Sequence, residues 1–316
     1  MKSNIKVSIL MPTYNHEKYI AKAIESALMQ KTNFEWELLI HDDCSTDSTK
    51  KIAESFAEKY PDRIILITEK ENQGLLKSYK KLLGIAKGKY LAILESDDYW
   101  TDENKLQMQA DFLENNEDYG IIATDILEID ERGGVANSNQ NFINRSNRLK
   151  ETEHWYEQLL GNRGIYWACS VMFRKLDFEK YCNIDEWIKL QFKTFDHPVW
   201  LSISFNKKCK YIPKVTAAYR VLSTSISNNK DEQKQMNFNI AIAQIEEYVI
   251  SKFGYGSLSP RQYNHMICTC IMGKALKLHN KKVFCDYARK FIPRTLKEKA
   301  MHLFPGLYYW QFTARH

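Results

Sequence analysis

The sequence predicts an α/β protein with a mostly parallel central sheet and helices on both of its faces, followed by a helical carboxyl-terminal appendage. Three observations lead to this prediction. Short apolar runs alternate with stretches of helical spacing in the first part of the chain. Polar or acidic residues follow three of these runs, as in sheets whose ligands bind at the carboxyl edge. From Lys234 onward, the composition is that of helices.

Strands and helices are expected to alternate from the start of the chain. Val7–Met11 is a short apolar run closed by Pro12, and Glu17–Gln30 follows with apolar side chains at helical spacing. The segment Ser45–Ser48 supplies capping residues for a helix that ends near Pro61. Further strands are expected at Leu38–Ile40, Ile64–Ile67, Tyr90–Leu94 and Gly120–Thr124, and further helices at Leu75–Ala86 and Asn104–Leu113.

The second half of the chain is less regular. Residues 130–150 are rich in Asn, Gly, Ser and Arg and predict a long loop, of the kind that often covers a site in enzymes. A strand is expected at Cys169–Phe173, a helix over Glu186–Phe205, and short strands on either side of Pro213. We therefore expect a domain over residues 1–225 and a helical region with a basic, aromatic-rich tail over residues 226–316.

Composition narrows the functional classes. The chain has 316 residues, of which 44% are hydrophobic and 27% charged, as in ordinary soluble proteins. The apolar run near the amino terminus is too short for a secretory signal, and no run approaches the length of a membrane span. The seven cysteines lack the spacing of zinc ligands, which favours reduced thiols and a cytoplasmic location.

The net charge of +6 is concentrated near the carboxyl end. Residues 274–299 include nine basic and two acidic side chains, so the rest of the chain has a net charge of −1. A basic groove across the main domain is therefore not expected, and we predict no nucleic-acid partner.

The segment Glu95-Ser96-Asp97-Asp98 places three carboxylates within four residues, directly after the apolar run Tyr90–Leu94. Carboxylates held this close repel one another, and a divalent cation relieves the repulsion because hard cations prefer oxygen ligands. The segment therefore predicts a metal site at the end of a buried strand, with phosphate chemistry as the leading expectation.

Three segments that end strands resemble the signatures of family 2 glycosyltransferases, whose nucleotide-sugar-binding fold is called GT-A. They are Val7–Asn15, Leu39–Asp47 and Leu94–Trp100, and the last match continues to Gln107. Shorter matches follow at Ser170–Arg174, Phe195–Leu201 and Tyr219-Arg220. The resemblance is strong over roughly residues 5–125 and does not include the last ninety residues.

The resemblance implies a set of residues that bind the donor nucleotide. These residues are Pro12, Thr13, Tyr14, Asp43, Lys77, Glu95 and Ser96. Asp43 would accept a hydrogen bond from the N–H of a uracil ring, with capping of the following helix as the alternative. Lys77 would offset diphosphate charge, or would be a solvated lysine on a helix face.

Metal and sugar contacts are implied by the same resemblance. Asp97 would hold Mn²⁺ or Mg²⁺, which would take up charge on the departing diphosphate. Asp98 would contact the donor sugar or cap the next helix. Arg220 would reach the diphosphate or an acceptor phosphate, or would be a surface arginine on an edge strand.

The resemblance implies an inverting mechanism with Asp196 as the catalytic base. Its carboxylate would take the proton from an acceptor hydroxyl as that oxygen attacks the anomeric carbon. A helix N-cap is the alternative role, because Pro198 would stand early in a helix.

Three positions depart from the family pattern. Glu95 stands where many relatives have Asp, Tyr79-Lys80 stands where the family often has Arg-Asn, and Phe195 stands where Glu or Gly is common. The departure at Tyr79-Lys80 leaves the phosphate contacts of that helix open.

The tail His302–Phe312 combines aromatic side chains with the basic stretch before it. Cations together with Trp and Tyr suit an anionic membrane surface, where a lipid-linked acceptor would be found. The alternatives are a helix packed on the main domain and a contact between two copies of the chain.

We therefore expect a metal-dependent inverting glycosyltransferase. It would move a sugar from a nucleotide-sugar, with a UDP-sugar favoured, to a hydroxyl of a glycan or lipid-linked glycan and form a β-linkage. One alternative is a nucleotidyltransferase acting on a sugar phosphate, although Pro12–His16 lacks the glycine-rich phosphate loop that such enzymes need. The other is a non-catalytic nucleotide-sugar-binding protein.

Overall fold

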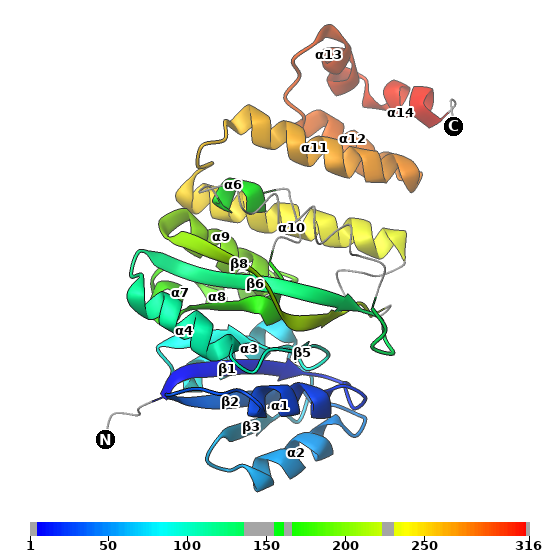
Figure 1. Ribbon diagram of the computed structural model, residues 1–316. Coiled ribbons are helices and arrows are strands. Elements are labelled where there is room, and N and C mark those ends of the chain that lie inside the picture. Colours follow the sequence, from blue (N-terminus) through cyan, green and yellow to red (C-terminus); the bar gives the residue numbers. More distant parts are fainter. Residues whose placement is uncertain (1–4, 136–154, 161–165, 223–230, 314–316) are drawn as a thin grey trace. The chain divides into compact units, whose positions relative to one another are not determined.

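Four parallel strands form the first part of an eight-stranded sheet. The computed structural model describes residues 5–135, 155–160, 166–222 and 231–313, so most of the loop expected at 130–150 lies outside the described residues. The parallel strands are β1 (Ile5–Thr13), β2 (Glu35–Asp42), β3 (Ile64–Thr68) and β4 (Tyr90–Ile93). They lie in the order β3-β2-β1-β4, of which Figure 1 labels the first three. Each coincides with an expected apolar run; β1 and β2 extend beyond theirs by several residues, β3 by one, and β4 ends one residue earlier than expected.

The rest of the sheet is mixed. Strand β7 (Val171–Arg174) pairs antiparallel with β4 and with β6 (Tyr119–Ile129). Strand β8 (Lys208–Arg220) lies parallel to β6, and β5 (Tyr99–Trp100) pairs antiparallel with β8. The two short strands expected around Pro213 are therefore one strand. Pro213 falls where the β6–β8 register shifts, so its missing N–H removes no regular ladder bond.

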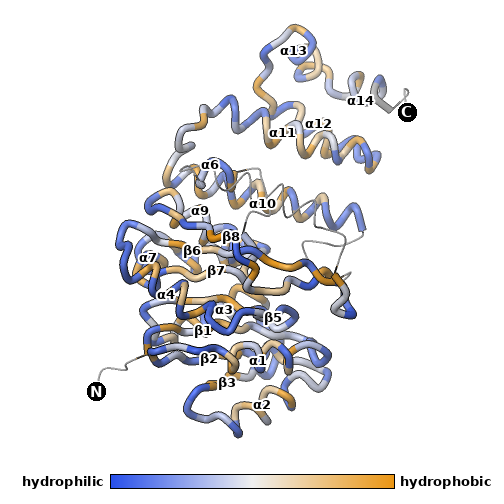
Figure 2. The backbone as a smooth tube through the Cα atoms, in the orientation of Figure 1, coloured by the Kyte–Doolittle hydropathy of each residue, from blue (hydrophilic) through white to orange (hydrophobic). Residues whose placement is uncertain are grey.

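Hydrophobic residues are frequent along the strands and alternate with hydrophilic ones along the helices (Figure 2). Helices α1 (Ile20–Leu28), α2 (Thr49–Lys59) and α4 (Lys105–Asn115) share one buried cluster with alternate residues of β1, namely Val7, Ile9 and Met11. The side chains between them point to the other face of the sheet. Helix α3 (Leu75–Ile85) contacts β1 and β2 and buries Leu76, Tyr79 and Leu82.

The helix expected over Glu186–Phe205 is two helices. Helix α8 (Ile184–Lys189) ends before Gln191, whose φ of +56° lies in the left-handed region and breaks the helix. Helix α9 (Asp196–Asn206) begins at Asp196 and has Pro198 in its first turn, where a missing N–H has no intrahelical partner to lose. The short helix α7 (Lys175–Tyr181) precedes α8 and contacts α9.

A second compact unit consists of residues 156–163 and 222–316. It contains most of α6 (Trp155–Leu159), then α10 (Glu232–Phe253), α11 (Pro260–Lys277), α12 (Lys281–Lys290), α13 (Leu296–Leu303) and α14 (Pro305–Thr313). Side chains of Asp231, Ser259, Asn280 and Thr295 cap the starts of α10 to α13. This confirms the helical carboxyl-terminal appendage of the predicted fold class. Among the described residues, no helix combines the length and apolar character needed to cross a membrane.

Candidate active site

The parallel register brings three strand ends to one edge of the sheet. Thr13 at the end of β1 is paired with Asp42 of β2, and Leu10 is paired with Ile93 near the end of β4. The backbone N–H of Leu94 continues the pairing by donating to the carbonyl of Leu10 at 3.0 Å. The polar segments that follow the three strands are therefore neighbours, although they are up to eighty residues apart in the sequence.

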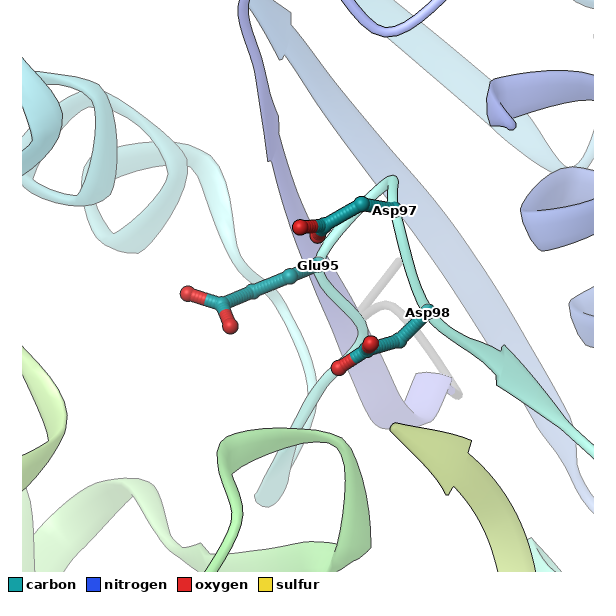
Figure 3. A group of neighbouring side chains, drawn as sticks. All are labelled: Glu95, Asp97 and Asp98. Carbon is teal, nitrogen blue, oxygen red and sulfur yellow. The ribbon is translucent and has the colours of Figure 1, made fainter. Parts of the chain in front are cut away.

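The loop after β4 gathers its three carboxylates on one side (Figure 3). One carboxylate oxygen from each of Glu95, Asp97 and Asp98 lies within 4.8 Å of the other two. The turn is closed by the N–H of Asp98, which donates to the carbonyl of Glu95 at 3.0 Å. Burial raises the pKa of Glu95 and of Asp98 well above their usual range, and the charge of Asp97 raises both further. A cation would relieve this repulsion, so the donor set fits a hard divalent metal.

Ser96 ties this loop to β1 from a fully buried position. Its hydroxyl donates to Thr13 Oγ1 at 2.8 Å and lies 2.7 Å from His16 Nδ1. His16 was not expected from the sequence, because no local pattern shows that it reaches Ser96. Pro12 is buried beside this contact, whereas the Tyr14 side chain is exposed.

Asp98 and Arg220 are joined by a hydrogen bond. Asp98 Oδ1 accepts from the backbone N–H of Arg220 at 2.7 Å, and Oδ2 is buried without an N–H or O–H donor among the described residues. Arg220 Nε donates to the carbonyl of Asp97 at 2.9 Å, and Nη1 donates to the carbonyl of Asp130 at 3.0 Å. The Arg220 guanidinium also lies 4.5 Å from the ring centroid of Tyr19. The buried arginine thus fixes the backbone that carries Asp97.

Asp43 connects the end of β2 to the start of α3. Its Oδ1 accepts from the N–H of Gln73 and its Oδ2 from the N–H of Gly74, each at 2.7 Å. Gly74 has φ +87°, a conformation that favours glycine, and is the N-cap of α3. Asp43 therefore caps α3, not the helix that follows it in the sequence. Lys77 is exposed on α3, where its ammonium lies 3.3 Å from Gln73 Oε1.

Asp196 lies close to the acidic loop. As the first residue of α9 it is half-buried, and its Oδ1 accepts from the N–H of His197 at 2.8 Å. Its negative charge contributes to the raised pKa values of Glu95 and of Tyr79. The fold thus brings together two carboxylates that lie about a hundred residues apart in the sequence.

Tyr79 is a site residue for which no role was predicted. It is 1% exposed, and its ring stacks on Phe195 with centroids 3.8 Å apart. Burial, together with the surrounding carboxylates, raises its pKa, so the phenol keeps its proton. The only signal in the sequence was the departure from the family pattern at Tyr79-Lys80.

Sequence comparison identifies the family. The family model described as Glycosyl transferase family 2 matches residues 8–180, which is more than half of the chain. The chain belongs to glycosyl transferase family 2. This confirms the resemblance that the motifs at the three strand ends indicated.

Two relatives illustrate the similarity. The Escherichia coli enzyme WfgD, named a UDP-Glc:alpha-D-GlcNAc-diphosphoundecaprenol beta-1,3-glucosyltransferase, is 30% identical over 237 residues, or 74% of this chain and 84% of that protein. EpsE of Bacillus subtilis is 41% identical over 133 residues, or 42% of this chain and 47% of that protein. The chain thus spans less than half the length of EpsE, and its matches to three mycobacterial proteins span 32% of theirs.

Two solved structures illustrate the shared fold. TarS of S. aureus, residues 1–349 in complex with UDP, has a TM-score of 0.62 at 17% identity and is matched over 98% of this chain and 89% of that one. The mannosyltransferase PcManGT of Pyrobaculum calidifontis, in complex with GDP-Man and Mn²⁺, has a TM-score of 0.57 at 16% identity, over 99% and 84% of the two chains. The expected GT-A fold is thereby confirmed.

Proposed function

We propose that this family 2 member is an inverting glycosyltransferase that moves a sugar from a nucleotide-sugar to an acceptor hydroxyl and forms a β-linkage. The proposal rests on one observation: Asp196 lies close to the carboxylates of Glu95, Asp97 and Asp98 at the carboxyl edge of the sheet. We assign the transfer to the domain at residues 1–225. A UDP-sugar is the favoured donor, since TarS binds UDP and WfgD is named for UDP-Glc.

The acidic loop would hold Mn²⁺ or Mg²⁺ through Asp97, with Glu95 and Asp98 beside it. When bound, the cation would supply charge neutralisation to the donor diphosphate, which becomes more negative as the glycosidic bond breaks. The described carboxylates fit this task, because their mutual repulsion falls when a cation is present. Asp98 would face the donor sugar, and Arg220 would keep the loop in place beside the diphosphate.

The edge formed by β1 and β2 would hold the nucleotide. Asp43 already accepts two backbone N–H groups, but each carboxylate oxygen has a second lone pair for the N–H of a uracil ring. Pro12, Thr13 and the exposed Tyr14 would lie against the base, and Ser96 would orient the loop toward the ribose. The exposed Lys77 ammonium would offset phosphate charge.

Asp196 would act as the base. Its carboxylate would accept the proton of the acceptor hydroxyl while that oxygen bonds to the anomeric carbon from the face opposite the leaving group. The bond between the anomeric carbon and the diphosphate oxygen breaks in the same step, and its electron pair leaves with the nucleoside diphosphate. Attack from the opposite face converts an α-linked donor into a β-linked product.

Two substitutions test these assignments. Asp97→Asn should abolish metal-dependent UDP binding in calorimetry, because the loop loses one charge of three. Asp196→Asn should keep UDP binding but lower the rate of transfer at least about a hundredfold. Asp111→Asn, an exposed carboxylate on α4, is the matched control and should change neither. Normal transfer by Asp196→Asn would show that the base lies elsewhere.

A panel of UDP-, GDP- and dTDP-sugars, screened for metal-dependent thermal shift, identifies the donor class. Product assays separate the other two functions. Release of pyrophosphate from a nucleoside triphosphate and a sugar phosphate would indicate a nucleotidyltransferase. Metal-dependent binding of UDP-sugar without transfer to any acceptor would indicate a non-catalytic binding protein.

We propose that the acceptor is a glycan or lipid-linked glycan and that the carboxyl-terminal helices contact the cytoplasmic membrane face. WfgD, which acts on a diphosphoundecaprenol acceptor by name, supports the acceptor class. The membrane contact is supported by apolar side chains that are more than half exposed on α13, α14 and the turn between them. These are Leu296, Leu303, Phe304, Leu307 and Trp310.

The arrangement of α14 fits a membrane surface. Tyr309 is buried against Phe284, at 5.6 Å between ring centroids, while Leu307 and Trp310 face outward and are 66% and 61% exposed. The ammonium of Lys281 lies 5.3 Å from the Trp310 ring centroid. Exposed basic side chains are frequent on α12, on α13 and between them, namely Lys281, Lys282, Arg289, Lys290, Arg294, Lys297 and Lys299. Cations beside exposed apolar groups complement anionic phospholipids.

Flotation with vesicles tests this contact in the full chain. The protein should bind vesicles of phosphatidylglycerol and phosphatidylcholine but not phosphatidylcholine alone. Combining Leu303→Asp with Leu307→Asp should weaken binding at least about tenfold, since apolar burial and lipid attraction are both lost. Leu176→Asp is the control, because Leu176 is 71% exposed on α7. A dimer in solution that the double substitution dissociates, without vesicle binding, would assign the surface to a second copy.

A further inference from the structure

His16 joins the end of β1 to the acidic loop after β4. Its Nδ1 lies 2.7 Å from the hydroxyl oxygen of Ser96, which is eighty residues further along the chain. The single proton of that hydroxyl is donated to Thr13 Oγ1 at 2.8 Å, so the proton in the 2.7 Å contact belongs to Nδ1 of His16. His16 therefore donates to Ser96, and Ser96 donates to Thr13.

The backbone of His16 is held by the starts of two helices. Its N–H donates to Thr49 Oγ1 at 2.7 Å, at the start of α2. Its carbonyl accepts from the N–H groups of Tyr19 and Ile20 at 2.9 Å and 3.0 Å, at the start of α1. The ring of His16 also packs edge-on against that of Tyr19, with centroids 6.3 Å apart. The scaffold thus determines where the His16 ring lies, and the ring in turn restrains Ser96.

Ser96 lies at the centre of the acidic loop. It is fully buried and occupies a central position of the turn that the N–H of Asp98 closes on the carbonyl of Glu95 at 3.0 Å. The residues on either side of it, Glu95 and Asp97, carry two of the carboxylates that gather on one side of the loop (Figure 3). These carboxylates repel each other, so the spacing between them depends on what holds the turn. A contact to Ser96 acts on both at once.

Arg220 holds the same turn from the other side. Its Nε donates to the carbonyl of Asp97 at 2.9 Å, and its backbone N–H donates to Asp98 Oδ1 at 2.7 Å. The Tyr19 ring, which packs against His16, lies 4.5 Å from the Arg220 guanidinium carbon. The turn is therefore restrained by His16 from β1 and by Arg220 from β8.

We propose that His16 is a positioning residue that holds the acidic loop in its metal-binding geometry through the Ser96 hydroxyl. The inference rests on the proposed function, in which this loop binds Mn²⁺ or Mg²⁺ beside the donor diphosphate. A loop that is held in place before the cation arrives loses less conformational freedom on binding, so the cation binds more tightly. The loss of one such hydrogen bond should lower the affinity about tenfold.

Two substitutions of His16 separate positioning from direct contact with the donor. The amide of Asn places an N–H donor where Nδ1 lies, whereas the amide of Gln places one where Nε2 lies, one bond further from the backbone. Calorimetry in the presence of UDP should therefore show that His16→Asn binds Mn²⁺ within about threefold of the wild-type affinity and that His16→Gln binds it about tenfold more weakly. Equal affinities of the two variants, or a lower affinity of His16→Asn, would contradict the inference.

Ser96→Ala tests whether His16 acts through this hydroxyl. The substitution should lower the affinity for Mn²⁺ at least as much as His16→Gln does. Adding His16→Gln to Ser96→Ala should then change the affinity by less than about twofold, because the contact is already lost. Additive losses would show that His16 does not act through Ser96 and would contradict the inference.

Ser8→Ala is the matched control. Ser8 is also a fully buried serine, and its hydroxyl donates to Glu37 Oε1 at 2.6 Å and accepts from the N–H of Gly88 at 2.8 Å, before β4 begins. Its substitution removes as many hydrogen bonds as Ser96→Ala, but away from the acidic loop. It should lower thermal stability and leave the affinity for Mn²⁺ unchanged. A loss of affinity as large as that of Ser96→Ala would show that general destabilisation explains both and would contradict the inference.

The metal-free protein and steady-state kinetics provide two further readouts. Without metal, hydrogen exchange in the segment Glu95–Asp98 should be faster in His16→Gln than in the wild type or in Ser8→Ala. With metal, the Mn²⁺ concentration for half-maximal transfer should rise about tenfold in His16→Gln, while kcat at saturating Mn²⁺ stays within about threefold. A fall in kcat with unchanged dependence on Mn²⁺ would contradict the inference.

The outcome is separable from that of the proposed function. Absence of transfer by the wild-type chain with every donor of the panel would contradict the proposed function, and calorimetry and hydrogen exchange would still test the role of His16. An active wild-type chain whose His16→Gln variant keeps the wild-type affinity for Mn²⁺ would contradict this inference alone.

Discussion

Replacing Asp43 by Asn separates two roles that this carboxylate combines. Both of its oxygens accept backbone N–H groups at 2.7 Å, from Gln73 and Gly74, and the residue is 4% exposed. Asn keeps the size and one acceptor oxygen, but its NH₂ group would meet a backbone N–H. One charge-assisted hydrogen bond is lost, and two donors are left facing each other without water.

The magnitude follows from these contacts. A hydrogen bond to a charged group contributes about 1.5–3 kcal/mol, so Asp43→Asn should lower the free energy of unfolding by about 2–3 kcal/mol. Asp43→Ala removes both bonds and should cost roughly twice as much. Because Gln73 and Gly74 lead directly into α3, UDP affinity should also fall, even though the substitution leaves the metal loop intact.

Urea unfolding followed by circular dichroism measures the stability, and calorimetry measures UDP binding. Asp62→Asn, an exposed carboxylate, is the control and should change neither quantity. A free energy of unfolding within about 0.5 kcal/mol of wild type would refute the capping argument. If UDP binding were then lost without any loss of stability, Asp43 would act on the nucleotide alone.

Three further predictions concern the scaffold around the site. Burial lowers the pKa of Lys105 from 10.5 to about 7. As the pH falls, the unfolded chain therefore binds a proton at this lysine before the folded chain does, which lowers the free energy of unfolding. The loss is at most about 5 kcal/mol, is complete below pH 7 and disappears as the pH rises toward 10.5. Lys105→Met should therefore flatten the rise in unfolding free energy between pH 7 and 9, and an unchanged slope would contradict the assignment. Arg220→Lys loses the guanidinium hydrogen bonds to the carbonyls of Asp97 and Asp130. Calorimetry in the presence of UDP should therefore show an affinity for Mn²⁺ about tenfold lower than that of the wild type. Equal affinity would exclude a role of Arg220 in positioning the metal loop. Gly88→Ala would place a Cβ 2.4 Å from the backbone nitrogen of Ser8, so the melting temperature should fall by about 10 °C or more. A melting curve like that of the wild type would show that the chain at Gly88 can move away from Ser8 without loss of stability.

Much of the fold and the location of the candidate site could be predicted from local sequence. Apolar runs such as Tyr90–Leu94 identify buried strands, because only a strand buried on both faces needs such a run. Parallel strands end at the same edge, which accounts for the adjacency of Thr13, Asp43 and the acidic loop. The family followed from the residues at these same ends.

Contacts between distant segments were decided by the tertiary structure. From the sequence, Arg220 is only a basic residue on an expected edge strand. In the structure, β8 packs beside β6, and the Arg220 guanidinium donates to the carbonyls of Asp97 and Asp130. Tyr79 and Phe195 are each an isolated departure from a pattern in the sequence, and only the tertiary structure stacks their rings on each other. Spacing along the chain determines which face of a helix or strand a side chain occupies. It does not determine which distant side chain it will meet, because that depends on how the helices and strands pack together.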